Sequence, residues 1–468
     1  MLSIFDSQQP MNRRAMLTVG GLGIAGAAGL DLSQLLAARA EKKSYTTGKS
    51  VIFLMQHGGP TQFETFDPKM DVDEAIRTVG GVAQTSIPGV HFGSSMSRLA
   101  RLADKLAVVR SYVGGSSGHG IRPVVSNETL KANLGSVYAR LTGVNHSVTG
   151  MPTNVAIDPT ALDPGDNGPD VRFGEFTQTG TLGKMYEPFV PGGGSNLQEN
   201  MKLLMPLSRF DDRKGLLQSL DRLKNEIDTT GVLEGVGRIR EQAYEMLIRG
   251  VGEAFDISRE DPQTIARYDT SQYISDTKYA NVSNGKSTRH WYQTNARTLG
   301  RLLLLARRLC EAGCGFVTVT TQFVWDMHGD KNNVGVARGM DAVGNPFDHA
   351  VSAFIEDCED RGLSDDIMLV TTGEMGRTPK INNRGGRDHW GGLTPLMLYG
   401  GGISGGQIVG QSSKDGGQPA TSPMGNENLV ATILQSLFDI GDLRLQSSLP
   451  SELIEYATSG TPIPGLVD

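Results

Sequence analysis

The chain has 468 residues, and its 44 lysine and arginine residues against 51 aspartate and glutamate residues give a formal net charge of −7. This acidic balance excludes a broad basic surface for nucleic acid or anionic lipid. The three cysteines, Cys310, Cys314 and Cys358, are interpreted as small buried apolar residues without a disulfide framework. The spacing of the first two also permits a disulfide or a metal ligand pair.

The first forty residues have the layout of a secretory signal. Arg13 and Arg14 precede a segment rich in glycine and alanine, and residues 38–40 form a small-x-small cleavage motif. The arginine pair is typical of twin-arginine export. The apolar run of about 16 residues is shorter than the about 20 needed to span a bilayer, which favours a cleaved signal over a membrane anchor. We therefore expect a mature chain of residues 41–468 in the periplasm or at the cell surface, without a transmembrane segment.

The mature chain alternates buried strands with amphipathic helices, which is typical of an α/β fold with a mostly parallel sheet. Gly313 and Gly362 follow two of the predicted helices and are expected to end them. We predict a three-layer α/β/α sandwich in a single domain. Strands are expected at residues 51–55, 106–110, 153–157, 316–321, 367–372 and 393–399, and helices at residues 97–105, 299–310, 347–358 and 428–438.

Residues 160–290 interrupt this alternation. Charged amphipathic helices are expected at residues 209–228 and 236–255, with polar stretches on both sides. We interpret the segment as a helical insertion that packs on the α/β core and shapes the rim of a site.

Polar residues gather after successive predicted strands, at the edge of the sheet where parallel α/β proteins bind their ligands. Carboxylates and imidazoles in such a place suit a divalent metal, Zn, Mn, Ca or Fe. The fork of an arginine suits a phosphate or sulfate oxyanion. The residues concerned are His57 after the first strand, Asp326 and His328 after the strand at 316–321, and Glu374, Arg377, Asp388 and His389 after the strand at 367–372.

Each of these residues also has a structural interpretation. Asp326 and His328 can form a capped turn with a satisfied histidine. Glu374 can be a charge at a helix N-terminus, and Arg377 can pair with it. Asp388 can hold His389 by a hydrogen bond as readily as it can bind a metal. Their occurrence at successive strand ends is what indicates a working site.

Several of these residues belong to blocks that resemble a bacterial family catalogued as domain of unknown function 1501. The most specific blocks are Gly-Glu-Met-Gly-Arg-Thr-Pro at residues 373–379 and Gly-Arg-Asp-His at residues 386–389, and residues 57–69 and 107–111 also match. The family looks like a distant branch of the alkaline phosphatase and sulfatase superfamily. The resemblance implies an α/β/α sandwich, a metal site at the strand ends and hydrolysis of phosphate or sulfate esters. It also implies metal-binding roles for Asp326, His328, Glu374 and His389, with Asp388 as a ligand or an orienting group.

The chain departs from the superfamily pattern in two places. Gln56 and His57 stand at the end of the first strand, where the superfamily has a metal-binding aspartate. The nucleophilic serine or threonine has no clear match. Ser117, in the Gly/Ser-rich segment 114–120, is the predicted nucleophile, with His119 as a metal ligand or an acid/base. A flexible surface loop is the alternative for that segment.

The leading hypothesis is an exported metal-dependent hydrolase of sulfate or phosphate esters. Its substrate would be a small molecule or a polysaccharide, held by Arg377 and attacked by Ser117 or by a metal-bound water, with His57 as a further catalytic residue. The rival is a non-catalytic surface protein that keeps the fold and binds glycans or partner proteins. A nucleotide-binding protein is disfavoured, because neither a Walker motif nor a strand-linked Gly-x-Gly-x-x-Gly motif with an acidic partner downstream is present.

Overall fold

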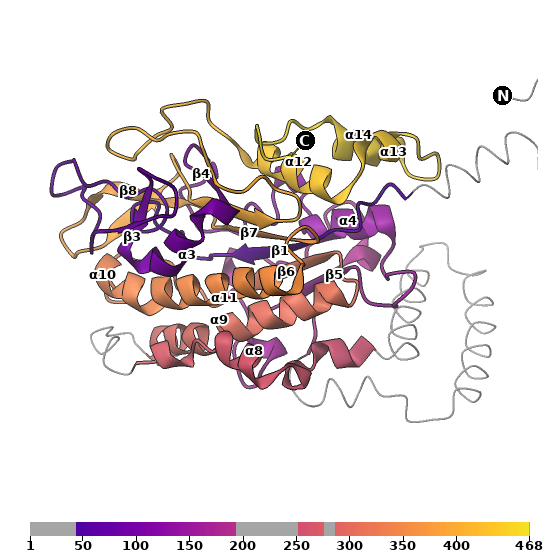
Figure 1. The fold of residues 1–468 in the computed structure, drawn as a ribbon, viewed down its shortest axis with the longest axis horizontal. Coiled ribbons are helices and arrows are strands. Elements are labelled where there is room, and N and C mark those ends of the chain that lie inside the picture. Colours follow the sequence, from indigo (N-terminus) through magenta and orange to yellow (C-terminus); the bar gives the residue numbers. More distant parts are fainter. Residues whose placement is uncertain (1–43, 193–250, 276–285, 468) are drawn as a thin grey trace, which may run out of the picture.

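The computed structural model describes residues 44–192, 251–275 and 286–467 (Figure 1). The predicted export signal lies outside these ranges. The same is true of the predicted helix at residues 209–228 and of most of the helix at 236–255. In the described part of the chain, no helix is long and apolar enough to cross a membrane.

A seven-stranded sheet forms the centre of the fold, and it is parallel except for one strand. The middle strands are buried on both faces of the sheet. Their sequences are therefore continuous apolar runs. In register, Leu54 pairs with Val319 on one side and with Thr371 on the other. The strand order is β11 (Gln407–Val409), β4 (Leu106–Val109), β10 (Leu396–Gly400), β7 (Ile367–Thr372), β1 (Ser50–Met55), β6 (Phe316–Thr320) and β5 (Asn154–Ile157).

Helices cover both faces of this sheet (Figure 1). Alternate residues of β1 face opposite layers, with Ile52 and Leu54 in one apolar cluster and Val51 and Phe53 in the other. The predicted α/β/α sandwich is therefore confirmed. One layer contains α3 (Ser97–Arg101), α9 (Lys286–Glu311) and α11 (Asn345–Arg361), and the other contains α4 (Leu134–Thr142), α12 (Asn426–Leu437) and α14 (Ser451–Ser459).

Shorter elements connect the layers. Two small antiparallel sheets are formed by β2 (Val82–Gln84) with β3 (His91–Gly93) and by β8 (Gly376–Ile381) with β9 (Arg387–Trp390). The remaining short α-helices of the described ranges are α8 (Pro262–Arg267), α10 (Val336–Gly339) and α13 (Ile440–Arg444).

The strand expected at residues 393–399 is present as β10, but it runs antiparallel to β7 and β4. A parallel strand needs a crossover of a dozen or more residues, usually a helix, before it re-enters the sheet. Here β7 is followed by the β8–β9 hairpin, and β10 returns directly beside β7. The hairpin replaces the loops expected around residues 373–389, and it carries several of the candidate site residues.

The described parts of the segment 160–290 consist mostly of turns and short 3-10 helices, with α8 as their α-helix before α9 begins. Glu260 joins this segment to the core, because its carboxylate pairs with Arg307 and Arg308 of α9 and with Arg361 of α11. The described part therefore packs on the helical layer. The three cysteines are free and buried, as expected.

Candidate metal centre

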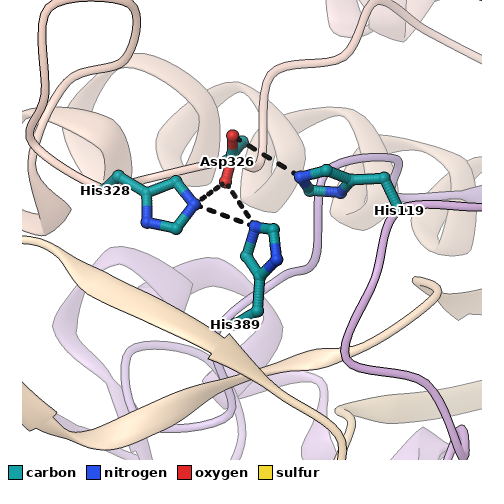
Figure 2. Close-up of side chains that lie close together, drawn as sticks. All are labelled: His119, Asp326, His328 and His389. Carbon is teal, nitrogen blue, oxygen red and sulfur yellow. Dashed lines mark hydrogen bonds and ion pairs between the residues drawn. The ribbon is translucent and has the colours of Figure 1, made fainter.

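Four side chains from three segments meet at the carboxyl edge of the sheet (Figure 2). His119 follows β4, Asp326 and His328 follow β6, and His389 belongs to β9. One potential ligand atom from each side chain lies within 4.8 Å of the other three. Parallel strands that end at the same edge bring these distant parts of the chain together.

Four separations between these atoms lie on either side of the spacing in a tetrahedral coordination shell, and all the ligand atoms lie within 4.8 Å of one another. His328 Nε2 lies 2.8 Å from His389 Nε2 and 2.9 Å from Asp326 Oδ1. His389 Nε2 lies 3.5 Å from that oxygen, and His119 Nε2 lies 3.7 Å from Asp326 Oδ2. Bonds of about 2.0–2.1 Å to a tetrahedral zinc ion place neighbouring ligand atoms about 3.3 Å apart. Three imidazoles and one carboxylate thus fit a single divalent cation.

The other ring nitrogen of each histidine faces a hydrogen-bond acceptor. These contacts fix both the orientation of a ring and the tautomer that it adopts. Carboxylates and carbonyls hold metal-binding histidines in this way in many metal sites. Each Nδ1 lies 3.0–3.1 Å from its acceptor, in the pairs His119–Glu374 Oε1, His328–Asp388 Oδ1 and His389–Ser117 carbonyl oxygen.

The contacts of the three Nδ1 atoms determine which kind of charge the centre of the cluster attracts. Because each Nδ1 faces an acceptor, it carries the proton of a neutral ring, and each Nε2 presents its lone pair to the centre. The lone pairs of His328 and His389 then face each other across 2.8 Å, beside the Asp326 carboxylate. A positive charge at the centre, carried by a metal ion or a proton, removes this repulsion. The donor set therefore fits a metal.

Asp326 is the anionic member of the cluster and is 5% exposed. Its Oδ1 accepts a hydrogen bond from Arg377 Nη2 at 2.7 Å, and its Oδ2 accepts one from Asn333 Nδ2 at 2.9 Å. Burial opposes ionisation, but the hydrogen bonds that the three histidines donate from Nε2 when their rings are protonated, together with the charge of Arg377, hold the pKa of Asp326 far below its ordinary value. The carboxylate is thus ionised and ready to bind a cation.

Two of the histidines attract protons in the metal-free protein. Burial lowers the pKa of His119, but its hydrogen bonds to Asp326 and Glu374 outweigh burial and raise that pKa overall. The hydrogen bond to Asp326 raises the pKa of His328. A protonated imidazole cannot bind a metal, so metal binding at this centre would release protons.

The sequence matches the family described as "Protein of unknown function (DUF1501)" over residues 48–443. The chain belongs to this family. The matched range contains the whole metal cluster, as well as Glu374, Arg377 and Asp388. None of the curated proteins compared with the chain matches it.

Several solved structures match parts of the fold of this family member. A sulfatase from Pseudoalteromonas sp., PsFucS1, is 12% identical with a TM-score of 0.31, and the match covers 91% of this chain and 72% of that one. The alkaline phosphatase from the Antarctic bacterium TAB5 is 11% identical with a TM-score of 0.24, over 76% of this chain and 92% of that one. The phosphonate monoester hydrolase of Agrobacterium radiobacter is 11% identical with a TM-score of 0.25, over 89% and 78%. Likenesses this distant carry no conclusion about activity.

The five residues predicted as ligands of this DUF1501 protein fall into two layers. Asp326, His328 and His389 lie in the four-residue cluster, and His119, predicted as a ligand or an acid/base, completes it. Glu374 and Asp388 contact ligand histidines instead. Glu374 is 1% exposed and also accepts a hydrogen bond from the Gly58 backbone N–H at 3.0 Å. Both carboxylates are therefore placed to orient the rings.

Arg377, expected to hold an oxyanion, is fully buried. Besides Asp326, its guanidinium donates hydrogen bonds to the carbonyl oxygens of Gly59 at 2.8 Å and Arg387 at 3.2 Å, and to those of Gly58 and Trp325. These contacts join the loops after β1 and β6 to β9. In this conformation the fork is engaged by the protein, which corrects the expectation that it faces a substrate anion.

His57 lies next to the cluster but outside it. The side chain is fully buried, and neither ring nitrogen has a hydrogen-bond partner within the described residues. The ring is surrounded by Phe173, Phe176 and Phe323, with centroids 5.0–6.0 Å away. Burial lowers the pKa of His57, so the imidazole is neutral. His57 is thus a buried neighbour of the metal cluster, enclosed by aromatic rings, and this placement gives no support to the catalytic role predicted for it.

Ser117 is exposed on the segment that carries His119. Its carbonyl oxygen contacts His389, and its hydroxyl lies against Gly391, where an added Cβ would come within 2.7 Å of Oγ. The segment 114–120 is therefore packed on the chain that follows β9, and the predicted nucleophile lies next to the cluster.

Residues that were not predicted from the sequence shelter and position the centre. The Phe323 ring packs edge-on against His119 with centroids 4.5 Å apart, and it stacks on Phe173 at 4.7 Å. The buried Arg387, which begins β9 two residues before His389, pairs with Glu64 at 2.9 Å. Phe323 lies three residues before Asp326, after the same predicted strand, so its place near the site could have been predicted from the sequence. The pairing of Arg387 with Glu64 could not have been predicted in this way.

Proposed function

We propose that the protein is an exported metal-dependent hydrolase of sulfate or phosphate esters. The observation that carries the proposal is the convergence of three Nε2 atoms and the Asp326 carboxylate on one point, with every Nδ1 held by an acceptor. A divalent metal bound there supplies a Lewis acid that polarises an ester oxygen and favours attack on sulfur or phosphorus.

The residues of the chain have separate tasks in this proposal. His119, Asp326, His328 and His389 hold the metal, and Glu374 with Asp388 keeps two of the rings in the metal-binding tautomer. Arg377 holds the Asp326 carboxylate in place through its hydrogen bond to Oδ1. Ser117 or a water is the attacking group. Imidazole ligands favour Zn, Mn or Fe over Ca, which prefers a shell of oxygen atoms.

Metal content and ester hydrolysis, measured on the same preparation, test the proposal. We expect about one divalent metal ion per chain and hydrolysis of at least one aryl sulfate or aryl phosphate. A chelator should remove both the metal and the activity, and added metal should restore them. A purified protein that takes up no divalent metal would overturn the proposal.

The alternative is a binding protein that keeps the fold without turnover. It is favoured by Gln56, which stands where the superfamily pattern has a metal-binding aspartate and whose buried amide atoms have no hydrogen-bond partner within the described residues. Stoichiometric metal without hydrolysis of any ester in a broad panel, together with binding of a sulfated glycan, would establish this alternative.

Export by the twin-arginine route is part of the proposal and rests on the sequence of residues 1–40. Changing Arg13 and Arg14 together to lysine is expected to leave the full-length protein in the cytoplasm. Cell fractionation with immunodetection checks this. The matched control is the double change of Lys42 and Lys43 to arginine, which should not alter export. Normal export of the Arg13→Lys, Arg14→Lys protein would contradict the assignment.

A further inference from the structure

An ester of sulfate or phosphate brings negative charge to the metal centre, and a basic side chain beside the metal ion would strengthen the binding of that charge. Arg377 is fully buried and its guanidinium bonds to protein atoms. A basic side chain that can serve this role must be fixed near the centre and still open to solvent. This inference rests on the function proposed above.

Arg384 sits on the turn that joins β8 to β9. Its backbone N–H donates to Asn382 Oδ1 at 2.9 Å, and Asn382 Nδ2 donates to the His328 carbonyl oxygen at 3.0 Å. Asn382 Nδ2 also lies 3.1 Å from Asp388 Oδ1, and the Val336 N–H donates to the Gly385 carbonyl oxygen at 2.9 Å. The backbone of the turn is thus bound directly to the loop that carries the ligand His328.

The side chain of Arg384 is free by comparison. It is 49% exposed, and its one ion pair within the described ranges joins Nη2 to Asp388 Oδ1 across 3.8 Å. That Asp388 oxygen lies 3.0 Å from Nδ1 of His328. One carboxylate therefore separates the guanidinium from a ligand histidine. The backbone of Arg384 is thus fixed, whereas its guanidinium is held loosely. The guanidinium can therefore turn toward an anion bound at the metal.

Arg172, another exposed arginine of the described residues, is more firmly engaged. Arg172 adjoins Phe173, whose ring lies 5.2 Å from the His119 ring. Its Nε, however, donates to both oxygens of Asp170 at 2.9 and 3.0 Å. A guanidinium already paired with a carboxylate gains less from a second anion.

We infer that Arg384 is the residue that binds the anionic group of the substrate, and that it gives the centre a preference for sulfate or phosphate esters over neutral ones. Its planar fork matches two oxygens of a tetrahedral oxyanion, whereas a lysine offers a point charge. Arg384 is thus a specificity-determining residue, and its side chain does not bind the metal.

Titration of the zinc-loaded protein with sulfate and, separately, with phosphate at low ionic strength tests this role. Charge-assisted hydrogen bonds of this kind support a loss of about 10- to 100-fold in oxyanion affinity for Arg384→Gln. Arg384→Lys is expected to lose less, because it keeps the charge without the fork. The oxyanion whose affinity falls more in Arg384→Gln, sulfate or phosphate, is the one that Arg384 prefers.

Zinc content is measured for each variant, and it should equal that of the wild type. Arg101→Gln is the matched control, because Arg101 is exposed on α3 and its described hydrogen bond goes to the carbonyl of its own helix residue Ser97. Unchanged oxyanion affinity in Arg384→Gln with full zinc content would overturn this inference alone. A wild-type protein that binds no metal would overturn the proposed function and this inference with it.

Discussion

The His389→Ala protein is expected to be purified without its metal and without ester hydrolase activity. Removal of His389 leaves three donors and takes away the Nε2 atom that lies closest to the one of His328. Loss of an outer carboxylate that orients a ligand costs about 10- to 100-fold in metal affinity. We expect the loss of a ligand to exceed that range. Elemental analysis and competition with a chelator of known affinity measure it.

Two further variants make this result specific. Glu374→Gln keeps the shape of the side chain that contacts His119 and should lose metal affinity within the 10- to 100-fold range of an orienting residue. His91→Ala removes an exposed imidazole on β3, away from the cluster, and should bind metal as the wild type does. Full metal content in folded His389→Ala protein would show that the four side chains do not form a metal site.

Most of the central sheet was predictable from the sequence, because strands buried on both faces consist of continuous apolar residues. The predicted strands at residues 51–55, 106–110 and 367–372 correspond to β1, β4 and β7, within one residue at each end. The β8–β9 hairpin was missed because its strands lack apolar alternation and are rich in charged and polar residues. Asn382 and Gly385 in its turn were the available signal.

The metal cluster could be predicted only in part. Strand ends located Asp326, His328 and His389, since the edge of a parallel sheet is a recurrent ligand site. Strand ends do not tell which carboxylate touches a metal and which touches a histidine, so Glu374 was expected as a ligand, and Asp388 as either a ligand or an orienting group. His119 was assigned less firmly because a Gly/Ser-rich segment has no periodic pattern that fixes its direction. The contact between that segment and His389 is a tertiary one.

Arg377→Met is expected to have the largest effect on folding. The change leaves the Asp326 carboxylate without its buried positive partner and leaves carbonyl oxygens of three segments without their donor. Removal of one partner of a buried ion pair costs about 3–5 kcal/mol in the free energy of unfolding. Urea unfolding of the metal-free protein measures this loss. Arg101→Met, on the exposed side of α3, is the matched control and should change stability by less than about 0.5 kcal/mol.

Arg377→Lys separates the charge of this residue from its geometry. A lysine keeps one positive charge near Asp326 but cannot reach the carbonyl oxygens of Gly59 and Arg387 together, because it lacks the fork. Stability should then recover in part, while metal affinity stays low because the loops that carry Asp326 and His389 are no longer joined. If Arg377→Lys restored stability and metal affinity to the same degree, the charge of Arg377 would be its whole contribution, and its role in positioning the loops would be refuted.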